Sequence, residues 1–80
     1  MDEKLKKCIE VLVHYVYDTY DGNESEIYTL SYYYMYINKV NDIEGLLACF
    51  VQAIIDVTDK EFSDVYKKIV NHPQVKKLLF

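Results

Sequence analysis

Large apolar side chains recur every three or four residues along nearly the whole 80-residue chain. This spacing places them on one face of an α-helix, whereas a half-buried β-strand would carry them at every second position. Two short stretches interrupt the pattern with residues that favour turns, at 21–23 (Asp-Gly-Asn) and 71–73 (Asn-His-Pro). Since a chain of this length forms one domain, the sequence predicts a single all-α domain over residues 1–80, a bundle of four helices plus a short C-terminal helix.

The first half of the chain predicts two helices joined by an irregular segment. One apolar stripe runs from about Asp2 to Tyr20, which we take as the first helix. Residues 24–29 include Ile-Tyr-Thr, whose β-propensity favours a loop or a short extended segment. A second helix is expected from Leu30 or Ser31 to about Val40, although its consecutive tyrosines leave a strand as the alternative.

The third predicted helix lies at the centre of the bundle. Asn41 and Glu44 have the spacing of an N-cap and N3 pair that satisfies two backbone N–H groups. From Ile43 to Ile55 the helix is apolar over most of its circumference, which is typical of a buried helix. This run is too short for a membrane span, which needs about 20 residues. Three small residues lie along one side, where another helix of this chain or of a twin subunit could approach closely: Gly45, Cys49 and Ala53.

Two more helices complete the predicted bundle. Thr58 and Glu61 repeat the capping spacing and predict a fourth helix that ends at about Val70. Pro73 suits the first position of a helix, so a short fifth helix is expected to follow it.

The chain lacks the residue patterns of an enzyme or a metal site. His14 stands one helical turn from both Glu10 and Asp18, but this stripe is the polar face of its helix and supplies no third and fourth metal ligand. Cys8 and Cys49 are expected to be reduced core residues of a cytoplasmic protein. We therefore expect no enzymatic activity, no cofactor and no metal, and no signal peptide is evident.

Charge favours a protein partner over nucleic acid. The formal net charge is −4, and arginine is absent. Residues 65–80 hold four lysines and no acidic residue: Lys67, Lys68, Lys76 and Lys77. A nucleic-acid-associated regulator that uses this end is the alternative function, since phosphate binding requires a positive patch.

Nine tyrosines are more than a small helical core can hold, and eight of them stand before residue 37. A helix cannot turn five consecutive large side chains inward, so some rings must contact solvent or a partner. Tyrosine is enriched at protein interfaces because it combines apolar area with a polar tip. We expect a homodimeric protein-interaction module, which a virus or mobile element could encode to modulate a host protein. Its expected contact residues are Tyr17, Tyr20, Tyr32, Tyr33, Met35 and Tyr36.

Overall fold

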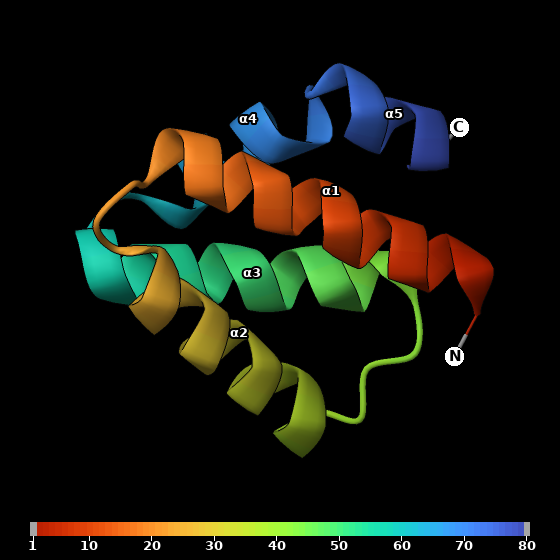
Figure 1. Cartoon of the computed structure of the whole chain (residues 1–80), viewed down its shortest axis with the longest axis horizontal. Coiled ribbons are helices and arrows are strands. Elements are labelled where there is room, and N and C mark those ends of the chain that lie inside the picture. Colours follow the sequence, from red (N-terminus) through yellow and green to blue (C-terminus); the bar gives the residue numbers. More distant parts are fainter. Residues whose placement is uncertain (1, 80) are drawn as a thin grey trace.

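The computed structural model describes residues 2–79, and within this range it contains five α-helices and no strand (Figure 1). The all-α bundle with a short fifth helix that the sequence predicts is therefore confirmed. The helices are α1 (Glu3–Thr19), α2 (Glu24–Ile37), α3 (Ile43–Thr58), α4 (Phe62–Val70) and α5 (Pro73–Leu79).

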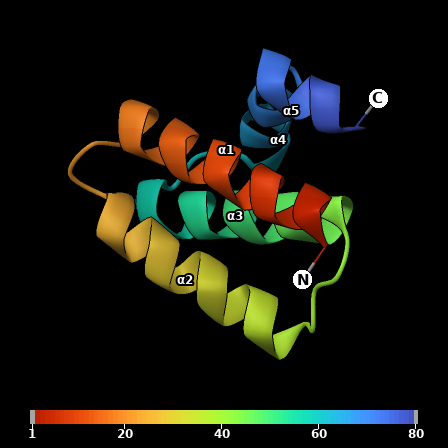
Figure 2. The same cartoon turned by 45° about the vertical axis from the view of Figure 1, so that its right-hand side comes forward.

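The central element is α3. It contacts α1, α2 and α4, while α5 packs on α1 and α4 (Figures 1 and 2). Its apolar residues point in several directions, so each neighbouring helix covers a different part of its surface. Leu46, Phe50 and Ile54 are fully buried there and join one core cluster to which all five helices contribute.

The sequence prediction for residues 24–29 is wrong, because α2 begins at Glu24. Glu24 and Glu26 lie in its first turn, where negative charge is stabilised by the helix dipole. The hydroxyl of Thr29 donates to the carbonyl of Ser25 (2.9 Å), so this polar group finds an acceptor within the helix. Ile27 is fully buried, so packing in the core outweighs the local β-propensity.

A tight turn joins α2 to α3. Lys39 adopts a left-handed conformation (φ 50°), and the N–H of Val40 donates to the carbonyl of Met35 (3.1 Å). This pattern is a Schellman motif, which stops α2 at Ile37 rather than near Val40. The side chain of Val40 then lies against the first turn of α3, where a Cβ added at Gly45 would be 3.3 Å from it.

The N-cap of α3 is Asp42 and not Asn41, so the predicted pair of Asn41 and Glu44 does not form. The Asp42 carboxylate accepts a hydrogen bond from the N–H of Gly45 (2.7 Å). A Cβ at Gly45 would stand 2.8 Å from this same carboxylate, so glycine leaves room for the cap. The small size of residue 45 is thus explained by the N-cap of α3, within one chain.

The predicted capping pair at the start of the fourth helix is also wrong. Thr58 belongs to the last turn of α3, where its hydroxyl donates to the carbonyl of Ile54 (2.7 Å). Asp59 then adopts a left-handed conformation, and Glu61 occupies the N-cap position of α4 without a side-chain hydrogen bond. The prediction that Pro73 opens the last helix is confirmed.

Replacing the cap should destabilise the domain measurably. We expect Asp42→Ala to lower the free energy of unfolding by about 1 kcal/mol, since it removes the acceptor of an N-cap hydrogen bond. Asn41→Ala, one residue away and without a capping role, is the matched control and should change stability by less than about 0.5 kcal/mol. Urea unfolding followed by circular dichroism measures both, and equal losses would contradict the assignment of the cap.

Candidate functional site

The tyrosines of α1 and α2 fall into two groups, those whose rings or hydroxyls are held by the fold and those that project into solvent. The phenol of Tyr28 donates to the carbonyl of Val13 (2.8 Å) and links α2 to α1. The phenol of Tyr34 donates to the carboxylate of Asp56 and links α2 to α3. These two bonds fix the position of α2 on the bundle.

Two residues predicted for the contact surface lie elsewhere. Tyr20 is only 8% exposed, because it ends α1 with its ring against the core and edge-to-face with Tyr15. Burial, with a smaller effect of Tyr15, raises the pKa of Tyr20 to about 12. Met35 is half-buried against the same core. Tyr20 therefore offers a partner almost no surface, contrary to the sequence prediction, whereas Met35 keeps part of its side chain exposed.

The other four predicted tyrosines project into solvent, and their hydroxyls make no hydrogen bond to any residue in the range 2–79 that the structure describes. Tyr36 is the most exposed at 83%, followed by Tyr17 at 61%, Tyr33 at 56% and Tyr32 at 47%. Ile37, which the sequence pattern did not single out, is half exposed and stands four residues after Tyr33. We call these five residues the tyrosine surface.

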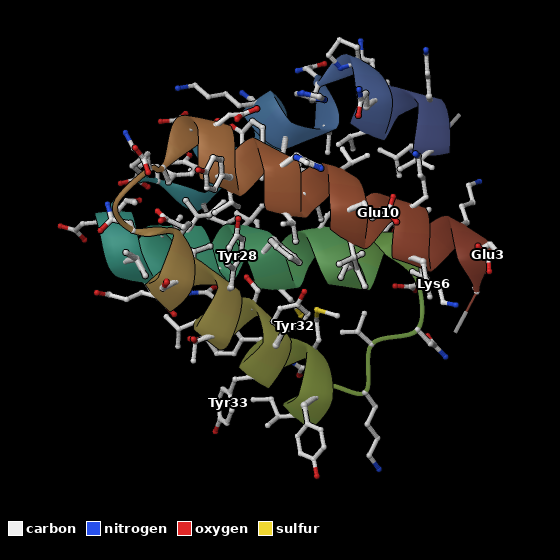
Figure 3. All side chains as sticks on the ribbon, viewed as in Figure 1. Glu3, Lys6, Glu10, Tyr28, Tyr32 and Tyr33 are labelled. Carbon is white, nitrogen blue, oxygen red and sulfur yellow. The ribbon has the colours of Figure 1, made fainter. Side chains whose placement is uncertain are left out.

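The tyrosine surface extends from α1 across α2. Tyr28 lies where these helices meet, and Tyr33 projects from α2 on the side away from the other helices (Figure 3). Burial raises the pKa of Tyr28, and so, less strongly, do its neighbours Glu24, Tyr32, Tyr17 and Asp18. Tyr17 and Tyr32 therefore both lie within electrostatic range of the Tyr28 hydroxyl. From there the surface continues along α2 at three- and four-residue spacing, which makes neighbours on a helix.

No charged residue occurs between Ile27 and Asn38, although this stretch forms most of an exposed helix. A surface helix of a soluble domain normally carries charge on its outer face. Here α2 buries Ile27 and Ser31 and presents aromatic rings on the opposite side. Contiguous exposed apolar surface of this kind marks interaction sites.

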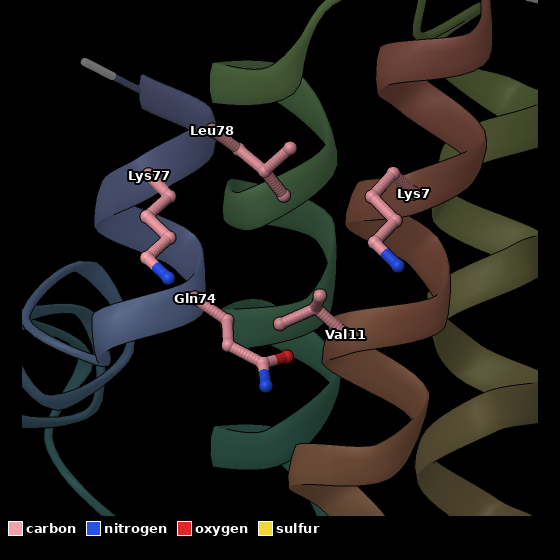
Figure 4. Close-up of a pocket in the computed structure, with 5 residues that line it drawn as sticks. All are labelled: Lys7, Val11, Gln74, Lys77 and Leu78. Carbon is pink, nitrogen blue, oxygen red and sulfur yellow. The ribbon is translucent and has the colours of Figure 1, made fainter.

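The structure does not gather the four C-terminal lysines in one hollow. Lys77 lies beside Lys7, Val11, Gln74 and Leu78 in a groove of about 270 Å³ between α1 and α5 (Figure 4). Lys68 lines a different hollow, beside the acidic residues Asp59, Glu61 and Asp64. At Lys68, therefore, negative charge adjoins the positive charge that the nucleic-acid alternative requires.

Both histidines line one hollow of about 240 Å³ where α1 meets the start of α5, which the sequence did not suggest. His14 and Asp18 come from α1, and His72 packs edge-to-face on Tyr15 (5.8 Å between ring centroids). Within residues 2–79, no three His, Cys, Asp or Glu side chains converge in a way that could hold a metal ion. Glu10 forms an exposed ion pair with Lys7 (3.9 Å).

Both thiols are buried and free, as the sequence predicts for core cysteines. Burial raises the pKa of Cys8 to about 11. Burial also raises the pKa of Cys49, although a hydrogen bond from Asn38 partly offsets this effect. Since the thiolate is the nucleophile, these environments disfavour cysteine chemistry near neutral pH.

Comparison of the chain with protein-family models, with curated proteins and with solved structures finds no match. In the part of the chain that the structure describes, no helix combines the length and the apolar character that crossing a bilayer requires.

The buried thiol predicts a loss of stability at alkaline pH. The pKa of Cys8 is about 11 in the folded chain against an ordinary value of 9.0, so between these pH values the unfolded chain binds fewer protons. The free energy of unfolding should therefore fall with rising pH in this window, by up to about 1.4 kcal/mol per pH unit, and the effect is absent below the window. Tyr20 adds a similar loss at higher pH.

Urea unfolding at a series of pH values measures this effect. In Cys8→Ala the decline near pH 9 should be shallower than in the unmodified chain, even though the variant is less stable at every pH. A free energy of unfolding that stays constant through this window would contradict the burial of the Cys8 thiol.

Proposed function

We propose that this chain is a non-catalytic protein-interaction module, and that the tyrosine surface is where it contacts another protein chain. The observation that carries the proposal is the exposure of four tyrosine rings and Ile37 on and beside a helix that carries no charge after Glu26. Such rings contribute most where a partner excludes water from them, because they bury large area with little loss of side-chain entropy.

Two features of the fold support this role for α2. Tyr28 and Tyr34 attach the helix to α1 and α3 through their hydroxyls. The exposed rings therefore stand on a fixed support, so that binding orders few groups that were mobile before. Rings that served only to fill surface positions would not need to be contiguous.

Cellular setting is a further part of the proposal. Two free, buried thiols suit the cytoplasm, where cysteines stay reduced. Small size and a composition rich in Lys, Ile, Tyr and Asn fit a modulator of a host protein encoded by a virus or mobile element.

Capture from an extract of the source cells tests the contact surface. We expect the triple variant Tyr32→Ser, Tyr33→Ser, Tyr36→Ser to bind the captured protein at least about tenfold more weakly, because several hot-spot side chains are lost together. The matched control is Phe62→Ser, which changes an exposed aromatic residue of α4 outside the tyrosine surface. Circular dichroism must show that both variants keep the helical fold.

A second control separates the two classes of partner. Replacement of Lys67, Lys68, Lys76 and Lys77 by Gln should leave capture unchanged. If the triple tyrosine variant captures as much partner protein as the unmodified chain, the proposal is wrong. Loss of nucleic-acid binding in the lysine variant alone would instead support the regulator that acts through the C-terminal end.

A further inference from the structure

The outer side of α2 carries a hollow near one end and two projecting side chains near the other. The hollow is a shallow, solvent-open depression of about 400 Å³ over the first two turns, lined by α2 alone. Its lining residues are Ser25, Glu26, Thr29 and Leu30. The projecting residues are Tyr36 and Ile37, in the last turn.

The hollow and the projection lie on the same side of the helix. Residues seven positions apart share a side, since seven residues make nearly two turns. Thr29 and Tyr36 are related in this way, as are Leu30 and Ile37, and as are Glu26 and Tyr33. Along this side the order is therefore hollow, Tyr33, projection.

We propose that this side of α2 binds a second copy of the same chain, with the two α2 helices antiparallel about a twofold axis. The inference rests on the proposed function and names the partner of the tyrosine surface. In this arrangement Tyr36 and Ile37 of each chain enter the hollow of the partner subunit. The Tyr32 and Tyr33 rings of the two chains meet at the axis.

The geometry of one helix is enough to set the register. The hollow is centred between residues 27 and 28 and the projection between residues 36 and 37, and these nine residues separate them by roughly 13 Å along the helix axis at about 1.5 Å per residue. The twofold axis must pass midway, close to Tyr32 and Tyr33. A twofold contact is self-complementary by definition, and a surface with both a hollow and a matching projection meets that condition.

Charge selects the antiparallel direction. The uncharged stretch is bounded by Glu26 before it and Lys39 after it. In the antiparallel register Lys39 of each chain lies opposite the first turn of the partner's α2, close to its Glu26, whereas a parallel pair would bring like charges together. Each chain carries a net charge of −4, so two copies repel each other overall. Contact through the uncharged stretch of α2 keeps that repulsion small.

The contact is small, because α2 has only 14 residues. One helix face of this length is at the lower end of the size range for specific interfaces, so the dimer should dissociate in the micromolar range.

Sedimentation velocity over a wide range of concentration tests the dimer. We expect Tyr36→Ala to weaken self-association at least about tenfold, because it removes the side chain that fills the hollow. Phe62→Ala is the matched control, since Phe62 is an exposed aromatic residue of α4 outside the tyrosine surface, and it should leave the dimer unchanged.

Charge reversal tests the direction. Glu26→Lys alone and Lys39→Glu alone should each weaken the dimer several-fold, because like charges then face each other in both halves of the contact. Mixing these two variants, or combining both changes in one chain, should restore association. In a parallel dimer each single variant would keep like charges opposite each other, as in the unmodified chain, so neither change would weaken association by itself.

Three results would overturn the proposal: a monomer at every concentration, a dimer that Tyr36→Ala leaves unchanged, or no recovery on mixing the reversed variants. A different outcome is a monomeric chain whose triple tyrosine variant fails to bind the protein captured from the extract. That outcome excludes a second copy as the partner and leaves the proposed function standing. Circular dichroism confirms that each variant folds.

Discussion

Burial of α3 is the constraint on which the rest of the structure depends. Its side chains are apolar in nearly every direction, so one partner helix cannot remove them from water. The chain meets this requirement with α1, α2 and α4 around α3, and with α5 closing the gap between α1 and α4. In so small a domain the apolar area that α3 buries is a large part of the stability, because little other core exists.

The same constraint accounts for the exposure of α2. Three helices cover α3, but no element of the described chain covers the far side of α2 (Figure 2). Ile27 and Ser31 face α3, and the sequence between them and Asn38 continues apolar or aromatic on the opposite side as well. A helix that is apolar on both sides and covered on one keeps part of its hydrophobic surface in water. That surplus, rather than any polar cluster, is the distinctive surface of this molecule.

Helical periodicity was enough to predict the fold class, the order of the helices and the buried thiols. It failed where two local signals compete. Residues 24–29 have β-propensity, and the helix forms there because it buries Ile27 in the assembled core. Asn41 and Asp42 are adjacent N-cap candidates of equal preference, and the backbone path from the preceding turn selects Asp42.

The contact residues could be predicted only in part, for a related reason. Tyr17 and Tyr20 are both tyrosines of the first helical segment, yet one projects into solvent and the other closes the core. The difference arises where α1 ends and the chain turns towards α2, which is a tertiary property. Ile37 escaped notice because the side of α2 that faces water depends on where α3 lies.

The turn between α2 and α3 has a consequence for how strongly the rings can act. Lys39 stops α2 in a left-handed turn, Val40 lies against α3, and Asp42 opens the next helix three residues after that stop. So short and hydrogen-bonded a link leaves the end of α2 little freedom to swing. The phenol groups near this end are thus held on a rigid backbone. Most of the conformational entropy that binding would otherwise cost is already lost when the chain folds.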